Sequence, residues 1–468
     1  MRKTKIIATL GPATFKLEKI QKLVMAGLNV VRINMSHEVP VDILEELIHI
    51  IRQESQRTEK SIAIFFDLCG PKIRVGSSFS ENSIKIKQGE KYRLGYESDI
   101  PLNIPVSFSS ELKDGQVKID DGNLVFDILQ TNEHELTLKS MNSGELLPGK
   151  GVNFPGIDLN IPSVTEKDLS DLELAVKLGI DWLAMSFVRS ANELKIITKS
   201  LEKHGVKIPV IAKIEKSEAI ENLDEIIDVF DGVLVARGDL GVEMPIRKLP
   251  ILQKKIVNQC LKRQKPVIIA TQMLESMVRN PSPTRAEVND VANAIYDGAD
   301  AVMLSAETAI GEYPLESVQM MSEIAESVER DLDRQNFNRY IHQDMEAVND
   351  NRSSICHSAM ILANDLSIQT LVIMTESGQT AIKMAQYRPK AHIYALCVHE
   401  NVCHMLSLIW GVTPVLVDTF QSTDEMITCS GEILRKNRYL KKGEKFIITA
   451  GAPVGITGTT NMIKIHEA

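Results

Sequence analysis

The feature that constrains the fold most is a regular alternation of short apolar runs with amphipathic stretches. Near the N-terminus, strand-like runs occupy Lys5–Leu10, Val30–Asn34 and Ser61–Asp67. The intervening stretches Leu17–Ala26 and Val41–Glu54 have apolar residues at helical spacing. Because strands that alternate with helices pair in parallel through helical crossovers, this pattern predicts an α/β fold.

The alternation breaks off after Asp67 and a β-rich segment replaces it. From Leu68 to Phe154 the apolar runs are short, and turn-forming residues separate them. The segment Val117–Phe126, with Asp121-Gly122 near its centre, predicts a β-hairpin. We therefore predict a small all-β domain over residues 68–154, inserted into the α/β pattern, and call it the β insert.

Strand–helix alternation resumes near Thr165, which has capping-box spacing with Asp168 at the start of an apolar-periodic stretch. Five further strand candidates follow: Trp182–Phe187, Val210–Ile214, Val233–Ala236, Val267–Ala270 and Ala301–Leu304. Together with the three strands before the insert they make eight, the number in a TIM barrel, whose active sites lie at the C-terminal ends of the strands. We predict a (β/α)8 TIM barrel over residues 1–67 and 155–338.

A third unit follows a polar, irregular stretch at Asn336–Asp350 that is typical of a linker. Strand-like runs recur among helical stretches, at Thr370–Thr375, Ile393–Leu396, Val415–Val417 and Phe446–Thr449. We predict a C-terminal α/β domain over residues 339–468.

Composition and charge narrow the classes of function. The chain is 44% hydrophobic and 25% charged, values that exclude a disordered or fibrous protein. Its 53 Lys and Arg against 62 Asp and Glu argue against a chain-wide nucleic-acid-binding surface but allow a local cationic pocket. The six cysteines form no CxxC pair, and no apolar segment approaches the ~18 residues of a membrane span. We expect a cytoplasmic protein that binds neither nucleic acid nor membrane.

Reactive side chains follow the predicted barrel strands. Glu215 and Asp239 end neighbouring strands, where facing carboxylates suit a divalent cation such as Mg²⁺. Lys213 shares a strand face with Glu215, because strand side chains repeat every two residues. A lysine there could stabilise a transferring phosphoryl group or an enolate, could form a Schiff base, or could serve only as an ion-pair partner.

Other strand ends carry groups suited to binding anions. Arg32 begins a polar cluster after the second strand, and arginine suits phosphate or carboxylate groups. Gly238 lies in a strand-to-helix turn whose N–H groups can hold an anion. Thr271 and Ser305 end the seventh and eighth strands, either as simple caps or as hydroxyls that reach the same site.

Eight segments, in order over nearly the whole chain, together resemble the pyruvate kinase family. They are Lys5–Thr14, Val31–His37, Gly70–Arg74, Lys150–Asn153, Lys213–Glu215, Ala236–Glu243, Ala270–Met277 and Met303–Thr308. The resemblance implies transfer of the phosphoryl group of phosphoenolpyruvate to ADP, which gives pyruvate and ATP in the last step of glycolysis.

The resemblance also implies residue roles. Mg²⁺ (or Mn²⁺) would bind Glu215 and Asp239, Lys213 would stabilise the transferring phosphoryl group and the enolate, and Arg32 would contact the phosphate. Backbone groups of Gly238 and Asp239, with Thr271, would hold the substrate carboxylate, and Thr271 and Ser305 would support protonation of the enolate carbon. The β insert would close as a lid, and the nucleotide would face Asn34, Met35, Ser36, His37, Arg74 and Lys150.

The segment that follows the third predicted strand differs from the sequence pattern of the potassium-dependent members of the family. That pattern reads Asp-Thr-Lys-Gly-Pro-Glu-Ile-Arg, whereas residues 67–74 here read Asp-Leu-Cys-Gly-Pro-Lys-Ile-Arg. Asn34, Ser36 and Asp67 match the family's K⁺ ligands, but Leu68 replaces a threonine and Lys72 replaces a glutamate. The tethered ammonium of Lys72 could supply the charge of K⁺, so our hypothesis is an enzyme that resembles the potassium-independent branch and needs Mg²⁺ but little or no K⁺.

In the C-terminal unit, Thr375, Ser377, Gly378 and Thr380 resemble the phosphate loop of the family's effector site. Glu376 stands where some members activated by sugar bisphosphates have lysine. The expected effector is therefore a sugar monophosphate or AMP, and the resemblance implies a homotetramer.

Two alternatives stay open at this point. A lyase or aldolase on the same kind of barrel would use the same metal and enolate chemistry, which explains Lys213, Glu215 and Asp239 but leaves the β insert and Lys150 without a role. A metabolite-sensing module without turnover is the other alternative, and the intact lysine, acids and hydroxyls argue against it.

Overall fold

The fold is described from a computed structural model. It describes residues 2–37, 39–77, 83–109, 114–157, 159, 161–335, 350–453, 458 and 460–468. The predicted boundary between residues 338 and 339, and all of the predicted linker except Asp350, lie outside these residues. Within the described residues no helix is both long enough and apolar enough to span a membrane.

Eight parallel strands close into a barrel in the order β1-β16-β15-β14-β13-β12-β3-β2, which confirms the predicted TIM barrel. The strands are β1 (Lys5–Thr9), β2 (Val30–Asn34), β3 (Ala63–Asp67), β12 (Trp182–Met185), β13 (Val210–Ile214), β14 (Gly232–Ala236), β15 (Val267–Ala270) and β16 (Ala301–Leu304). Almost every strand residue is buried, because strands with a filled interior and a helical exterior have no solvent face.

Helices surround the barrel and begin where local signals place them. They are α1 (Leu17–Ala26), α2 (Val41–Thr58), α3 (Glu166–Leu178), α4 (Leu194–Lys203), α5 (Ser217–Glu221), α6 (Leu223–Val229), α7 (Arg237–Glu243), α8 (Leu249–Lys262), α9 (Arg285–Tyr296), α10 (Ala306–Ala309) and α11 (Pro314–Gln335). The capping box predicted at Thr165 is present, since its Oγ1 accepts from the Asp168 N–H and the Asp168 carboxylate accepts from Thr165.

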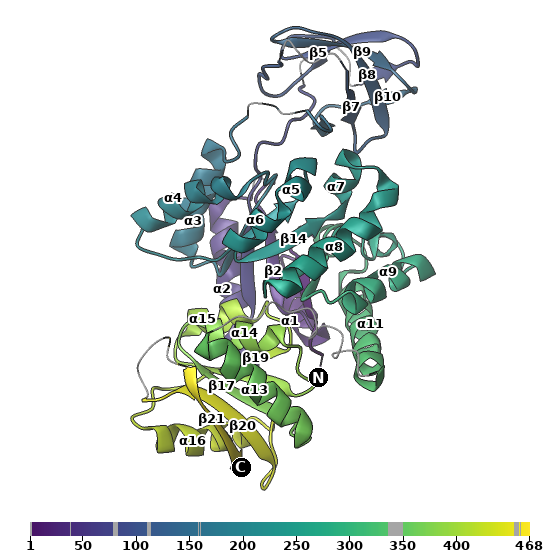
Figure 1. Cartoon of the computed structure of the whole chain (residues 1–468). Coiled ribbons are helices and arrows are strands. Elements are labelled where there is room, and N and C mark those ends of the chain that lie inside the picture. Colours follow the sequence, from purple (N-terminus) through teal and green to yellow (C-terminus); the bar gives the residue numbers. More distant parts are fainter. Residues whose placement is uncertain are drawn as a thin grey trace.

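The β insert lies above the barrel, at the end where β3 leaves it (Figure 1). A six-stranded sheet has the order β11-β7-β8-β9-β5-β6, and β10 pairs separately with β4. The strands are β4 (Ile84–Ile86), β5 (Lys91–Gly95), β6 (Ile100–Pro101), β7 (Gln116–Ile119), β8 (Leu124–Thr131), β9 (Glu135–Ser140), β10 (Gly144–Leu146) and β11 (Val152–Asn153). The antiparallel pairing of β7 with β8 confirms the predicted hairpin.

The C-terminal unit lies at the opposite end of the barrel (Figure 1). Its sheet has the order β19-β18-β17-β20-β21, parallel except for β21. The elements are α13 (Asn351–Asp365), β17 (Thr370–Thr375), α14 (Gln379–Gln386), β18 (His392–Cys397), α15 (Glu400–Leu406), β19 (Val412–Leu416), α16 (Thr423–Lys436), β20 (Lys445–Gly451) and β21 (Thr460–Glu467).

The barrel floor and the C-terminal unit share one hydrophobic core. Polar links cross the same boundary: Trp182 Nε1 donates to Met405 O at 3.0 Å, and Lys5 Nζ donates to Val412 O at 2.7 Å. The N-terminal ends of the strands are therefore covered, and the C-terminal ends beneath the β insert remain for a site.

Candidate active site

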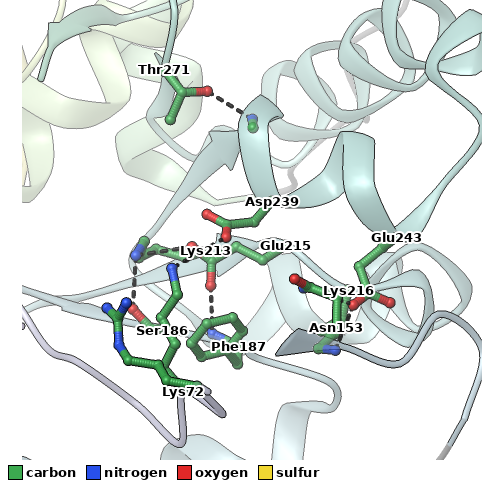
Figure 2. A network of polar contacts seen from close by, with 12 residues as sticks. Lys72, Asn153, Ser186, Phe187, Lys213, Glu215, Lys216, Asp239, Glu243 and Thr271 are labelled. Atoms are coloured by element: carbon green, nitrogen blue, oxygen red, sulfur yellow. Dashed lines mark hydrogen bonds and ion pairs between the residues drawn. The ribbon is translucent and has the colours of Figure 1, made fainter. Parts of the chain in front are cut away.

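Lys213, at the end of β13, lies at the centre of a charged cluster at the barrel mouth (Figure 2). Its Nζ is 3.1 Å from Asp67 Oδ1 and 2.9 Å from Glu215 Oε1, and it donates to Ser186 Oγ at 2.7 Å. Burial alone would lower the pKa of Lys213, but the charges of Asp67 and Glu215 outweigh it and raise the pKa. Lys213 is therefore a permanent cation in this site.

Asp67, at the end of β3, holds a second cation in the same mouth. Its Oδ2 accepts from Arg32 Nε at 2.8 Å and from Arg32 Nη2 at 2.6 Å. Burial would raise the pKa of Asp67, but Lys213 and Arg32 lower it overall. Arg32 Nη1 also donates to Thr9 Oγ1 at 2.9 Å, and the Thr9 hydroxyl donates to Leu304 O. Two cations from different strands are thus fixed by one buried carboxylate.

Two carboxylates with the chemistry of divalent-cation ligands lie beside this pair of cations. Glu215 is 1% exposed and its Oε2 accepts from the Phe187 N–H at 2.8 Å, whereas Asp239, in the first turn of α7, is partly exposed. Burial raises the pKa of Glu215, Lys213 opposes the shift, and the negative charge of Asp239 adds to it. A bound dication would relieve the repulsion between the two acids, so the donor set fits Mg²⁺ or Mn²⁺.

The protein supplies few metal ligands beyond these two acids. Among the described residues, no group of three or more His, Cys, Asp or Glu side chains is placed to hold a metal ion. A dication held by Glu215 and Asp239 would complete its coordination with water and substrate oxygens, as Mg²⁺ sites commonly do.

Lys72, from the first segment of the β insert, reaches into the same site (Figure 2). Its Nζ is 3.6 Å from Asp239 Oδ1, with the two side chains 30% and 27% exposed. The β insert therefore contributes one positive charge beside a candidate metal ligand.

The hydroxyl groups of the seventh and eighth strands lie at the same mouth. Thr271 has a positive φ of 67°, and its Oγ1 accepts from the Gly238 N–H at 2.9 Å (Figure 2). Ser305 follows β16, and its N–H donates to Glu307 Oε2 at 2.7 Å. The buried Glu307 also accepts from the Leu274 N–H at 3.0 Å, so it joins the two strand-end loops that carry the hydroxyls.

Comparison with known proteins decides the family. A family model described as "Pyruvate kinase, barrel domain" matches residues 1–318, and one described as "Pyruvate kinase, alpha/beta domain" matches residues 353–466. The chain belongs to the pyruvate kinase family. A curated pyruvate kinase of Geobacillus stearothermophilus is 40% identical over 99% of this chain and 80% of that protein. One from Staphylococcus aureus (strain MRSA252) is 41% identical over 100% of this chain and 80% of that protein.

Solved structures agree with this assignment. The crystal structure of a pyruvate kinase from Cryptosporidium parvum covers 100% of this chain and 96% of its own, with a TM-score of 0.92 and 30% identity. As a pyruvate kinase, the chain is a glycolytic phosphotransferase that transfers the phosphoryl group of phosphoenolpyruvate to ADP, and the family uses a divalent metal.

The predicted nucleotide residues of this pyruvate kinase fall into two groups. Asn34 ends β2 and Met35, Ser36 and His37 follow it in a turn, where Asn34 Oδ1 accepts from the Ser36 N–H at 3.2 Å. Arg74 and Lys150 belong to the β insert, where Arg74 Nη1 donates to Gly149 O and Lys150 pairs with Asp120 at 2.6 Å. These contacts of Arg74 and Lys150 lie within the β insert. The structure therefore does not join them to the cluster of Lys213, Asp67, Arg32 and Glu215, which we call the Lys213 cluster.

Several site residues were missed by sequence reasoning. The sequence predicts a strand that runs to Phe187 and so includes Ser186, the partner of Lys213, whereas β12 ends at Met185. Phe187 has a φ of 54°, which turns its N–H toward Glu215. A Cβ at Gly70, where φ is +66°, would lie 2.9 Å from the Phe187 ring, so the chain can pass there only as glycine. The position of Ser186 directly after an apolar run was the available signal.

The predicted effector residues surround the turn between β17 and α14. Thr375 Oγ1 accepts from the Gly378 N–H at 2.9 Å, and Gly378 has a φ of 80°. The hydroxyls of Thr380 and Thr460 are 2.8 Å apart, while Ser377 is exposed. Hydrogen bonds of the Thr375 and Thr380 hydroxyls thus hold the turn between β17 and α14, and Ser377 is exposed to solvent.

Proposed function

We propose that the Lys213 cluster performs the phosphoryl transfer of this pyruvate kinase. The supporting observation is the convergence of Lys213 and Arg32 on the buried Asp67. Asp67 and the further contacts of Lys213 with Glu215 and of Arg32 with Thr9 hold both cations in place, so they present fixed positive charge to the phosphoryl group. Fixed charge stabilises a transferring phosphoryl group and an enolate without reorganisation in the transition state.

The divalent metal is proposed to be Mg²⁺ (or Mn²⁺), held by Glu215 and Asp239. When bound, it would supply Lewis-acid stabilisation of charge on the substrate oxygens. The N–H of Phe187 fixes the orientation of the Glu215 carboxylate, and the short helix α7 presents Asp239. Charged hydrogen bonds of this kind hold ligand carboxylates in their binding geometry.

The backbone of Gly238 and Asp239, with the Thr271 hydroxyl, is proposed to bind the carboxylate of phosphoenolpyruvate. The Gly238 N–H donates to Thr271 Oγ1 and the Thr271 hydroxyl donates to Ala270 O, so the substrate carboxylate would replace one of these partners at the start of α7. Thr271 and Ser305 are proposed to support protonation of the enolate carbon, because both residues follow strands that end at the same mouth.

The nucleotide is proposed to bind between the segment Asn34–His37, at the end of β2, and the β insert, with Arg74 and Lys150 on its phosphates. Closure of the β insert as a lid would bring these cations over the site and exclude water. We assign residues 1–67 and 155–338 to the catalytic domain, 68–154 to the lid and 339–468 to the regulatory domain.

Lys72 is proposed to replace the monovalent cation. Its ammonium lies beside Asp239, in a chain where Asn34, Ser36 and Asp67 match the family's K⁺ ligands. Because Asp67 is already neutralised by Arg32 and Lys213, the site does not need a further cation at that carboxylate. The enzyme then works without K⁺, as in the potassium-independent branch.

The remaining proposals concern regulation and setting. Thr375, Ser377, Gly378 and Thr380 would bind the phosphate of AMP or a sugar monophosphate through hydroxyl and N–H groups at the start of α14. The assembly is proposed to be a homotetramer in the cytoplasm, in line with the family.

Metal binding tests the proposed site directly. Electron paramagnetic resonance titration of Mn²⁺ compares the wild type with Glu215→Gln and Asp239→Asn, and Glu221→Gln, on an exposed residue of α5, is the matched control. We expect each site variant to weaken Mn²⁺ binding at least about tenfold, since one of two charged ligands is lost. Unchanged affinity in both site variants would reject the assignment.

A further inference from the structure

Two side chains of the β insert rest on the last two residues of α7. Lys118 Nζ donates to Val242 O at 2.6 Å, and Asn153 Nδ2 donates to Glu243 Oε1 at 3.3 Å. Lys118 and Asn153 are themselves direct cross-strand partners in the pairing of β7 with β11. Two neighbouring donors of the β insert therefore form hydrogen bonds with two consecutive residues of the barrel, Val242 and Glu243.

Glu243 receives a second group, from the barrel itself. Lys216 Nζ is 2.7 Å from the same Oε1 that Asn153 contacts (Figure 2). The Glu243 side chain is 1% exposed, and its Oε2 has no hydrogen-bond partner among the described residues. A buried carboxylate is costly unless a charged partner and hydrogen-bond donors hold it, so both Lys216 and Asn153 matter to its position.

Glu243 is linked to both proposed metal ligands, to Glu215 through Lys216 and to Asp239 through α7. Lys216 directly follows Glu215 in the chain, and α7, which ends at Glu243, carries Asp239 in its first turn. A helix of this length is only about 10 Å long, so a shift at one end moves the other. The ion pair between Lys216 and Glu243 thus spans the two elements whose carboxylates must lie at a fixed separation.

We propose that Glu243 is a positioning residue that couples the docking of the β insert to the separation of Glu215 and Asp239. The inference rests on the metal site and the lid role proposed above. When the β insert docks, Asn153 and Lys118 draw the end of α7 into place, and Lys216 transmits the same constraint to the end of β13. Glu243 touches no reacting atom and acts through these neighbours.

Single substitutions can remove the contacts of the β insert with α7 separately from the ion pair between Lys216 and Glu243. Lys118→Met and Asn153→Ala remove contacts from the β insert only, and Lys216→Met removes the barrel contact only. Glu243→Gln keeps the shape of the side chain but removes its charge. Lys139→Met, on an exposed residue of β9, is the matched control within the β insert.

The measurements are kcat, the KM for ADP, the Mn²⁺ dissociation constant and the thermal midpoint. We expect Lys118→Met and Asn153→Ala to lower kcat/KM for ADP at least about tenfold, because each loses a hydrogen bond that docks the β insert. Both variants also weaken Mn²⁺ binding, but by less than Lys216→Met does, because the ion pair between Lys216 and Glu243 remains. Lys216→Met weakens Mn²⁺ binding at least about fivefold, and Glu243→Gln shows both effects. Adding Asn153→Ala to Glu243→Gln then costs little more, because the two residues act as a unit.

Wild-type Mn²⁺ affinity and kcat in Glu243→Gln would overturn the proposal, and so would a lower thermal midpoint without any kinetic change. If Glu243→Gln does not fold, wild-type kinetics in both Lys118→Met and Asn153→Ala would overturn it. Failure of the proposed function is recognised separately, because Lys213→Met would then keep its activity whatever these variants do.

Discussion

Replacing Lys72 with methionine is expected to make this pyruvate kinase depend on K⁺. The perturbed interaction is the one between Lys72 Nζ and Asp239 Oδ1, 3.6 Å apart. At that distance two unit charges interact by about 1 kcal/mol in water and about 4–5 kcal/mol at an effective dielectric constant of 20. The side chains are 30% and 27% exposed, so solvent screening keeps the value near the lower figure, at roughly 1–2 kcal/mol. This corresponds to a loss of about 5- to 30-fold in rate if the charge acts fully in the transition state.

The assay is the initial rate of pyruvate formation in K⁺-free buffer, with ionic strength held constant by tetramethylammonium chloride, because salt screens exposed charges. We expect the wild type to be unaffected by K⁺. The Lys72→Met rate falls by about tenfold and recovers partly on adding K⁺, since a free cation can then take the place of the lost ammonium beside Asp239. Lys72→Arg, which keeps the charge, is the control. Strong K⁺ activation of the wild type, or a wild-type rate for Lys72→Met in K⁺-free buffer, would refute the reasoning.

Three further predictions concern other parts of the molecule. Burial, with a contribution from Arg2, lowers the pKa of Lys5 from 10.5 to about 7. Between pH 7 and pH 10.5 the unfolded chain therefore holds a proton on Lys5 that the folded chain lacks, and the free energy of unfolding of the wild type rises with pH. Lys5→Met lacks this titrating group, so its free energy of unfolding is expected to fall behind that of the wild type by about 1.4 kcal/mol for each pH unit in this range. Denaturant unfolding at several pH values measures the difference, and a difference that does not change with pH would contradict the prediction. Thr271→Val loses the hydroxyl that faces the Gly238 N–H and is expected to lower kcat at least about tenfold with an enlarged solvent isotope effect; an unchanged kcat would exclude a proton-transfer role. Thr375→Val is expected to weaken the binding of AMP in isothermal titration by at least about fivefold, and no heat of binding for any sugar phosphate or nucleotide monophosphate to the wild type would remove the effector site.

The architecture was predictable because its signals are local. Each barrel strand is an apolar run that is buried on both faces, and such runs stand out between amphipathic helices. The hairpin at Val117–Phe126 was predictable because Asp120, Asp121 and Gly122 all adopt positive φ, which these residue types tolerate.

The core of the candidate site was also predictable, because a barrel brings all strand ends to one mouth. Lys213, Glu215 and Asp67 were expected at strand ends, and the structure joins them by direct contacts. Their chemical roles stay predictions, as do those of Arg74 and Lys150, whose contacts lie within the β insert.

The contacts that orient these residues could not be read from the sequence. The approach of Lys72 to Asp239 depends on how the β insert sits on the barrel, which no local pattern records. The positive φ of Phe187 is unusual for an aromatic residue, and only tertiary packing shows why its N–H faces Glu215. The role of Glu243 depends on three segments that are far apart in the sequence.

The measurement that tests the central claim most directly is pyruvate formation from phosphoenolpyruvate and ADP by wild type and Lys213→Met, with Mn²⁺ binding measured on both. The account predicts that the wild type turns over and that the variant loses at least about 10²-fold in kcat, because its fixed charge on the phosphoryl group is gone, while it still binds Mn²⁺. A wild-type kcat for Lys213→Met would contradict the account.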